Sequence, residues 1–239
     1  MLNPAQPYSS FLPIVTSFVT DAWERVLRCA NIFEEFSDVL YSIHHSFDLG
    51  IHSTPAHTYI PPNHTSAIQH PLEIKAYINN ELSHGRYLGP FSPDCLETLI
   101  GPFWTSPLGV IPKQVPGKYC LVQDFSYPCN DRLQGSLNSK IDMTNLSCDW
   151  GTFQEVTAII IDAPPNTQAT TLDVDAAFWH CPIKPSQQCN FFIYFDGLCY
   201  IDHVTPFSTA STSFAFWSCC RCHDGDPAPS GHWSSQKLG

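Results

Sequence analysis

The chain has 239 residues, of which 43% are hydrophobic and 13% aromatic, so it can bury a sizeable core and is not a disordered segment. Lys and Arg total 11 against 22 Asp and Glu, and the formal net charge of -11 argues against a generic phosphate-binding surface. The 11 cysteines lie at irregular spacing without a secretory signal, which disfavours a secreted disulfide scaffold. No stretch approaches the ~18 apolar residues of a membrane span, so we expect an intracellular protein with no signal peptide and no transmembrane segment.

The first part of the chain is predicted to be mainly helical. Apolar residues recur at helical intervals between residues 17 and 49, which predicts one or two amphipathic helices with Asp21 near an N-cap. Residues 50 to 71 are rich in His, Pro and Thr and are predicted to form a loop or extended arm. A helix is predicted from residue 71 to 82, with proline at its first position, and another from 93 to 100.

Short extended segments separated by Pro and Gly follow residue 101. Residues 106 to 110, 119 to 125 and 137 to 141 are predicted to be hairpin strands. A helical pattern then covers residues 152 to 161. This change from helices to short strands indicates an α+β chain.

A strand is predicted over residues 169 to 174. Residues 191 to 195 and 198 to 203 are predicted to form a β-hairpin around the two-residue turn Asp196-Gly197. From residue 218 to 239 there is no apolar periodicity and Cys, Pro, Gly and Ser are frequent, which predicts a disordered tail.

The most informative residue from the pattern alone is Asp173. It lies near the end of the predicted strand over residues 169 to 174, and small residues lead from it to Phe178 five positions later. A carboxylate held at a sheet edge can bind a hard divalent cation through its oxygens. The alternative is an Asp that caps a strand-to-helix turn, which is a common arrangement and which the pattern alone favours.

Four blocks of the chain resemble reverse transcriptases in order and spacing, over roughly residues 60 to 216. The block with Asp173 resembles motif A, L-D-x-x-x-A-[FY]. The block just before it resembles the fingers hairpin of the same enzymes. The first block resembles the versions carried by eukaryotic tyrosine-recombinase retroelements. A fourth block falls where motif B is expected. The blocks are residues 85–91 with 101–103, residues 106–113 with 117–126, residues 170–183, and residues 203–211.

This resemblance implies an α+β fold made of the fingers and partial palm of a reverse transcriptase-like polymerase, with an N-terminal helical region. The implied organisation is a helical lead with a Pro/His-rich loop over residues 1–85, a fingers-like hairpin region over 86–149, a partial palm over 150–217 and a tail over 218–239. The ancestral activity would be RNA-directed DNA polymerisation, a nucleotidyl transfer. The implied partners are an RNA/DNA primer-template, a deoxynucleoside triphosphate, and the missing palm, thumb and RNase H-type regions.

The resemblance also assigns roles to single residues. Asp173 matches the catalytic aspartate that binds Mg²⁺, with the Val174 carbonyl as a further ligand. Phe178 matches the aromatic residue that packs under the deoxyribose, and Lys113 matches a fingers lysine that approaches the triphosphate. Lys118 in the hairpin block and Phe207 in the motif B block complete the implied nucleotide-binding set. The alternatives are a solvated lysine at position 113 and a core-packed ring at position 178.

Two departures from the family pattern count against present activity. Two-metal catalysis needs carboxylates from two places, and no aromatic-x-Asp-Asp hairpin occurs in these residues; the late pair Asp224 and Asp226 has no flanking apolar strands. A lone Asp173 is expected to bind Mg²⁺ weakly, so we expect no polymerase activity from this chain. In addition, Cys or Trp stands at four positions where relatives tend to carry arginine, which suggests codons altered by cytosine deamination. These positions are Trp104, Cys120, Cys129 and Trp179.

Two other classes of function stay open at this stage. One is a non-catalytic remnant that binds nucleic acid or a protein. The other is a small secreted or metal-stapled protein, for which Cys219, Cys220, Cys222 and His223 suggest zinc ligands. A structural zinc site needs four ligands with a second pair further along, and only the distant His232 remains, so an incidental cluster is favoured.

Overall fold

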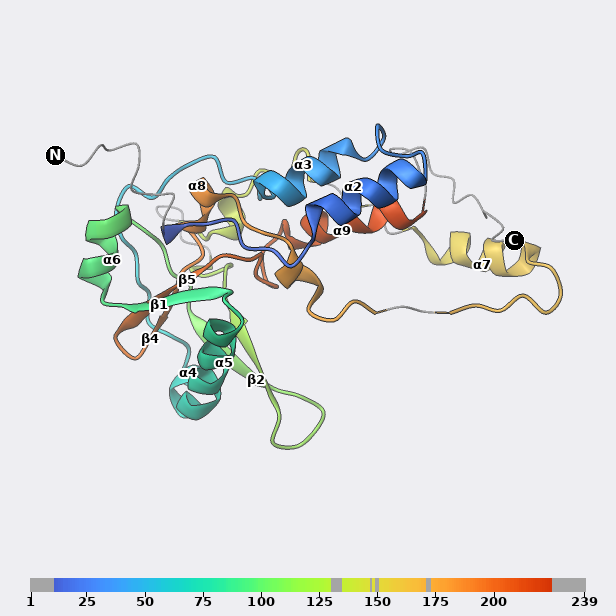
Figure 1. Ribbon diagram of the computed structural model, residues 1–239. Coiled ribbons are helices and arrows are strands. Elements are labelled where there is room, and N and C mark those ends of the chain that lie inside the picture. Colours follow the sequence, from blue (N-terminus) through green and yellow to red (C-terminus); the bar gives the residue numbers. More distant parts are fainter. Residues whose placement is uncertain (1–10, 130–134, 147, 149–150, 171–172, 225–239) are drawn as a thin grey trace.

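The computed structural model describes residues 11–129, 135–146, 148, 151–170 and 173–224, and it confirms the α+β class. Helices and short antiparallel strands are both present in the described part of the chain (Figure 1). The elements are α2 (Thr20–Cys29), α3 (Ser37–His45), α4 (Thr65–Gln69), α5 (Pro71–Ser83), β1 (Tyr87–Phe91), α6 (Pro93–Ile100), β2 (Leu108–Pro112), β3 (Tyr119–Gln123), η1 (Asn138–Lys140), α7 (Phe153–Asp162), η2 (Ala177–His180), α8 (Pro185–Gln188), β4 (Ile193–Phe195), β5 (Leu198–Asp202) and α9 (Thr212–Asp224).

A three-stranded antiparallel sheet has the strand order β1-β5-β4. The predicted β4–β5 hairpin is confirmed, and both turn residues, Asp196 and Gly197, have positive φ as a tight hairpin turn requires. Strand β1 comes from a much earlier part of the chain and pairs Tyr87 with Asp202. The sheet therefore joins the segment predicted as fingers to the segment predicted as palm.

Side chains of β5 alternate between two hydrophobic clusters, because successive residues of a strand point to opposite faces. Cys199 and Ile201 are fully buried in the cluster that contains Leu96 and Ile100 of α6. Tyr200 packs into the other cluster, which contains Ile74 and Ile78 of α5. Helices thus cover both faces of the sheet and fix the position of its edge.

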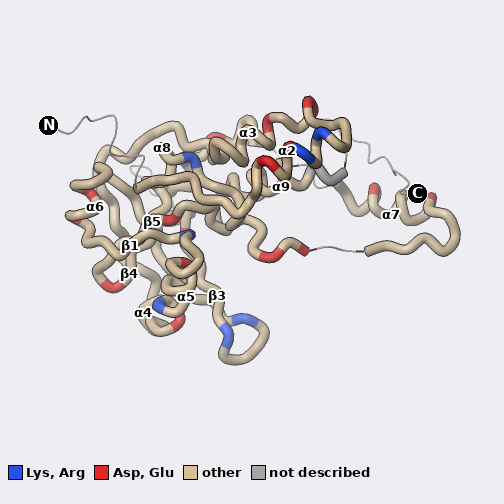
Figure 2. Tube along the Cα trace, viewed as in Figure 1, with Lys and Arg blue, Asp and Glu red and all other residues tan. Residues whose placement is uncertain are grey.

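Strands β2 and β3 form the predicted antiparallel hairpin, with Leu108 opposite Gln123 and Pro112 opposite Tyr119. Its loop is closed where the Lys113 N–H donates to the Lys118 carbonyl at 2.8 Å and the Lys118 N–H donates to the Val115 carbonyl at 3.1 Å. The hairpin extends from the body, and Figure 2 shows basic residues on its loop.

A third cluster joins the N-terminal helices to the end of the described chain. Leu27 of α2 and Val39 and Ile43 of α3 are buried with Ala215 and Cys219 of α9. Figure 1 shows α9 beside α2 and α3. The prediction that the disordered tail begins at residue 218 was therefore wrong for the residues up to 224, because Cys219 is only 3% exposed and anchors the helix in this core. The rest of that predicted tail, residues 225–239, lies outside the described residues.

Three local predictions also differ from the structure. Residues 137–141 contain the 3₁₀ helix η1 rather than a strand. Residues 169, 170, 173 and 174, the described part of the strand predicted over 169–174, are not in a strand, because no neighbouring strand pairs with them despite their β-forming composition. The predicted loop over residues 50–71 contains the short helix α4, which buries Ala67 completely.

Helix α7 lies away from the rest of the described chain (Figure 1). It begins with a capping box in which the Thr152 hydroxyl accepts from the Glu155 N–H and the Glu155 carboxylate accepts from the Thr152 N–H. None of its residues is buried, and Phe153 at its start is 82% exposed. No helix in the described ranges has the length and apolar content needed to cross a membrane.

Candidate functional site

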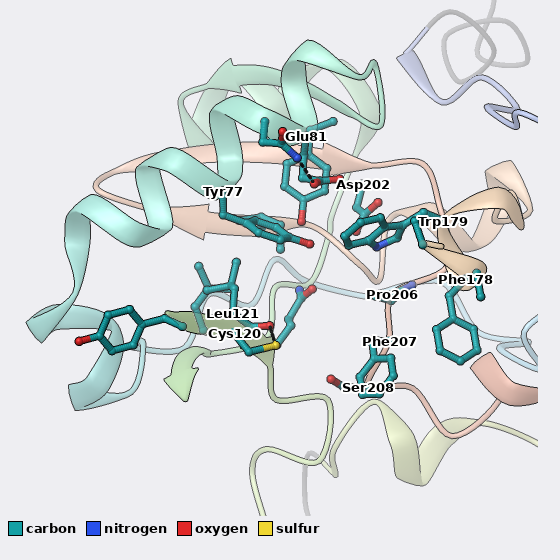
Figure 3. Close-up of a pocket in the computed structure, with 18 of the residues that line it drawn as sticks. Tyr77, Glu81, Cys120, Leu121, Phe178, Trp179, Asp202, Pro206, Phe207 and Ser208 are labelled. Atoms are coloured by element: carbon teal, nitrogen blue, oxygen red, sulfur yellow. Dashed lines mark hydrogen bonds between the residues drawn. The ribbon is translucent and has the colours of Figure 1, made fainter. Parts of the chain in front are cut away.

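A pocket of about 600 Å³ lies between the sheet, the β2–β3 hairpin and the segment that follows residue 172 (Figure 3). Its walls come from α5 and β1, from β2 and β3, from residues 173–179, and from β4, β5 and residues 206–208. These segments are far apart in the sequence, so only the folded chain creates the pocket. Its volume is typical of pockets that hold a small organic ligand.

This pocket brings together five of the six residues that the sequence singled out. Lys113, Asp173, Val174, Phe178 and Phe207 all line it. Asp173 is exposed, Val174 is 48% exposed, and Phe207 is 75% exposed, so these side chains are accessible to a ligand. The sixth residue, Lys118, is exposed on the hairpin loop and does not line the pocket.

Phe178 is half-buried between the pocket and α9. Its ring lies 5.4 Å from the ring of Phe207 and 5.7 Å from that of Phe216, measured between centroids. The packing with Phe216 holds one side of the ring, while the other side remains in the pocket wall. The Phe178 ring is therefore packed against α9 and also lines the pocket.

The segment that carries Asp173 is held in place by the N-terminal part of the chain. Ala176 has a φ of 54°, and the turn that it makes leads into η2. The carbonyl of His180, at the end of η2, accepts a hydrogen bond of 2.6 Å from the Thr16 hydroxyl, and its ring is hydrogen-bonded to the Ser17 hydroxyl. The other ring nitrogen of His180 lies 2.9 Å from the Asp175 carbonyl oxygen. Residues 16 and 17 therefore help to position the predicted metal-binding segment.

Sequence reasoning missed a buried polar network behind the pocket. Arg86 Nη2 donates to Glu81 Oε1 at 2.9 Å and Arg86 Nε donates to Glu81 Oε2, which makes a bidentate pair. The Arg86 guanidinium also lies over the Trp179 ring, 4.6 Å from its centroid. Asp202 is 4% exposed and lines the pocket with Glu81, which is 1% exposed. Arg86 does fall within one of the family-like blocks, but nothing in the sequence pairs it with Glu81.

Burial changes the proton affinity of several groups in this network. It raises the pKa of Asp202 well above its usual range; the Val204 N–H that bonds its carboxyl opposes this shift, and the nearby Glu81 carboxylate adds to it. Burial also raises the pKa of Tyr87 and of Tyr77, and nearby carboxylates add to both shifts. Both tyrosines therefore keep their hydroxyl protons at neutral pH and offer hydrogen-bond donors rather than negative charge.

The oxygen donors around the pocket do not fit a two-metal centre. Asp173 supplies an exposed carboxylate, whereas Glu81 is occupied by Arg86 and Asp202 is deeply buried. Nowhere in the described ranges do three or more His, Cys, Asp or Glu side chains gather in a way that could hold a metal ion. Two-metal phosphoryl transfer needs carboxylates placed to hold both ions.

Comparison with known proteins gave similarity to solved structures alone. No protein-family model matches the chain, and no curated protein matches it. The native protease-reverse transcriptase of prototype foamy virus is 17% identical, covers 93% of this chain and 27% of its own length, and has a TM-score of 0.49. The foamy viral protease-reverse transcriptase in complex with an RNA/DNA hybrid is 13% identical, with coverages of 91% and 26% and a TM-score of 0.49. The present chain thus spans about a quarter of the length of these two chains, 27% and 26%.

Proposed function

We propose that this chain is the fingers and partial palm of a reverse transcriptase-like polymerase, and that it does not catalyse nucleotidyl transfer by itself. The observation that carries the proposal is the gathering of Lys113, Asp173, Phe178 and Phe207 in one pocket. These residues belong to three separate family-like blocks of sequence. The pocket corresponds to the nucleotide site of the ancestral enzyme, in which Lys113 faced the triphosphate and Phe178 the sugar.

The proposed lack of activity follows from the donor set. Mg²⁺, when bound at such a site, supplies positive charge that stabilises the transferring phosphoryl group. Here the Asp173 carboxylate and the Val174 carbonyl would hold such an ion, and no second exposed carboxylate among the lining residues assists them. A single carboxylate binds Mg²⁺ weakly, because this ion gives up its water reluctantly.

Primer extension tests this proposal. The purified chain, incubated with an RNA template, a DNA primer and all four deoxynucleoside triphosphates, is expected to give no extension with either Mg²⁺ or Mn²⁺. An active reverse transcriptase in the same buffer serves as the positive control. Extension that is abolished by Asp173→Ala would overturn the proposed inactivity, because it would show that Asp173 still supports catalysis.

A second candidate, non-catalytic binding of nucleic acid, is favoured by the hairpin loop. Lys113 and Lys118 are both exposed there, and no ion pair joins either of them to an acidic residue within the described ranges. By contrast, Lys75 and Lys184 pair with Asp196 and Asp48 at 2.7 and 2.9 Å. Unpaired lysines on a projecting hairpin are suited to contact phosphates, even on a chain that is acidic overall.

We therefore expect weak, salt-sensitive binding to a primer-template duplex that depends on these two lysines. The double variant Lys113→Ala/Lys118→Ala should reduce the slope of log affinity against log salt by about 2, roughly one for each phosphate contact. Fluorescence anisotropy with a labelled duplex measures this slope. Lys75→Ala/Lys184→Ala is the matched control, since it also removes two positive charges and both ammonium groups are already paired. An equal loss of affinity in the control would show that only net charge matters.

A further inference from the structure

One end of the pocket is built from three aromatic rings and a buried carboxyl group. The ring of Tyr77 meets those of Tyr87 and Trp179 edge to face, with centroids 6.3 and 6.4 Å away. Asp202 lies beside this row because it is the register partner of Tyr87, and opposite residues of paired strands project from the same face of a sheet. All four residues line the pocket, and Figure 3 shows Tyr77, Trp179 and Asp202 around the same part of the opening. These rings favour a ligand with a flat apolar body.

The Asp202 carboxyl group is buried with half of its hydrogen-bonding capacity unused. Only 4% of the residue is exposed, and its Oδ1 accepts a hydrogen bond of 3.1 Å from the Val204 N–H. No hydrogen bond or ion pair from the described residues reaches its Oδ2. A buried polar atom without a partner costs free energy. Because this side chain lies in the wall of a cavity, a bound molecule can supply the missing partner.

The ionised groups of the pocket balance one another. The Glu81 carboxylate is matched by the Arg86 guanidinium in the bidentate pair, and the lining residues Asp173 and Lys113 contribute one charge of each sign. Burial raises the pKa of Asp202 well above its usual range, so this carboxyl group is neutral at pH 7. The pocket therefore has no excess charge to attract an ion, and its balance suits a neutral ligand.

The neutral carboxyl group of Asp202 is a hydrogen-bond donor. Its Oδ1 acts as the carbonyl oxygen, because it accepts from the Val204 N–H. The proton then belongs on Oδ2, the oxygen without a partner in the described part of the chain, where it forms an O–H donor. A ligand suited to this end of the pocket accordingly carries a hydrogen-bond acceptor, such as a ring nitrogen or a carbonyl oxygen, on its edge.

We propose that this end of the pocket binds a neutral, planar heteroaromatic molecule whose edge acceptor receives a hydrogen bond from Asp202 and whose rings lie against Tyr77 and Trp179. The pocket volume of about 600 Å³ accommodates a bicyclic ring system. The inference uses none of the four residues that carry the proposed function. The binding test and the primer-extension test can therefore fail independently.

A matched pair of small molecules tests the preference for an acceptor. Indazole and indole are bicyclic, similar in size and neutral at pH 7, and both carry an N–H group; indazole alone has a second ring nitrogen that accepts a hydrogen bond. Isothermal titration of the full chain is expected to give roughly three- to tenfold tighter binding of indazole, the effect of one neutral hydrogen bond. An ionised Asp202 would give the opposite order, because a carboxylate repels the lone pair of that nitrogen. Equal affinities, tighter binding of indole, or no binding of either at millimolar concentration would overturn the proposal.

Two substitutions at position 202 identify the donor. Asp202→Asn should keep the preference for indazole, because the Val204 N–H retains the amide oxygen and turns the amide N–H₂ toward the pocket. Asp202→Leu has a similar size and no donor, so it should bind both molecules equally. Asp94→Leu, at an exposed position at the start of α6, is the control and should behave like the parent chain. Circular dichroism checks that each variant is folded.

The outcome does not depend on a single variant. Loss of the preference in a folded Asp202→Asn chain would contradict the role of Asp202 as the donor. Persistence of the preference in a folded Asp202→Leu chain would contradict it as well. If the leucine variant does not fold, the comparison of indazole with indole on the parent chain and on Asp202→Asn still decides the proposal.

Discussion

At the scale of single residues, the ion pair between Glu81 and Arg86 helps to position the pocket wall. Their side chains are 1% and 16% exposed, so both charges are largely removed from water. Such a pair contributes little net stability relative to apolar residues of the same volume, but the loss of one partner leaves the other charge buried and unpaired. The pair also holds the guanidinium over Trp179, so it links a buried helix residue to the pocket wall.

We predict that Glu81→Gln lowers the free energy of unfolding by about 3–5 kcal/mol, because Arg86 then loses its counter-ion in a buried setting. Urea denaturation followed by circular dichroism measures the change. Glu24→Gln is the control: its i,i+4 partner Arg28 is 56% exposed, and such exposed pairs contribute only about 0–1 kcal/mol. Similar decreases in the free energy of unfolding of the two variants would show that burial does not make the Glu81–Arg86 pair more important for stability.

The sequence predicted the part of the site that lies in recognisable motifs and missed the rest. Asp173, Phe178 and Lys113 belong to blocks whose residue order resembles a known family, so their meeting in one pocket could be anticipated. Tyr77, Glu81 and Asp202 could not be assigned in this way. They enter the pocket because β1 pairs with β5, a long-range register that no local pattern specifies.

At the scale of elements, α9 is the clearest difference from expectation. Its sequence near the C-terminal end lacks a strong amphipathic pattern because the buried positions are small residues rather than large apolar ones. Ala215 and Cys219 are four residues apart, the helical spacing that places both on one face, and they are 0% and 3% exposed. These small buried residues place α9 in the same hydrophobic cluster as the N-terminal helices, but they give a weak hydrophobic signal in the sequence.

A pair of truncations tests the structural role of α9. A chain that ends after Trp217 loses the buried Cys219 side chain and the last turns of the helix, so its free energy of unfolding should fall by at least about 1 kcal/mol. A chain that ends after Asp224 keeps the whole helix and should unfold like the full chain. Thermal unfolding monitored at 222 nm, a standard wavelength for helix content, compares the three chains. Equal unfolding temperatures for all three chains would show that residues 218–224 do not stabilise the fold.

Elements defined by local chemistry were predicted well. The hairpins β2–β3 and β4–β5 and the helices α5 and α6 all begin and end close to their expected positions, because turn residues and N-terminal prolines mark them. The expected strand ending at Asp173 failed for a different reason. Its β-branched residues favour an extended chain, but a strand also needs a neighbour, and the described part of this stretch has none.

At the scale of the whole molecule, a buried histidine makes stability depend on pH. His203 is 2% exposed and its Nδ1 lies 2.9 Å from the Gln188 side-chain oxygen. Burial lowers the pKa of His203 from 6.5 to about 4 in the folded state. Between these two values the unfolded chain binds a proton that the folded chain does not, so folding is progressively disfavoured as pH falls through this window.

We predict that this histidine alone removes about 3 kcal/mol of stability between pH 7 and pH 4. The raised pKa of Asp202 acts in the opposite direction, since the folded state then binds its proton more readily than the unfolded state, so the effect must be measured as a difference. Urea unfolding of the parent chain and of His203→Gln across this range should show a shallower decline in the variant. His44→Gln, on the exposed end of α3, should follow the parent. If the free energy of unfolding fell equally with pH in the parent and in His203→Gln, His203 would not be the source of the pH dependence.

The pairing of β1 with β5 also sets the order in which the molecule can be built during synthesis. The hairpin β2–β3 and helices α4 to α6 need only neighbouring residues, so they can form while the chain is still short. The central sheet cannot close until the ribosome has produced the partner of Tyr87, which is Asp202. The apolar face of α5 and the buried half of β1 must wait for their final covering while the residues between Phe91 and Asp202 are added. Slow elongation over the intervening residues would therefore lengthen the period in which chaperones or aggregation compete for this surface.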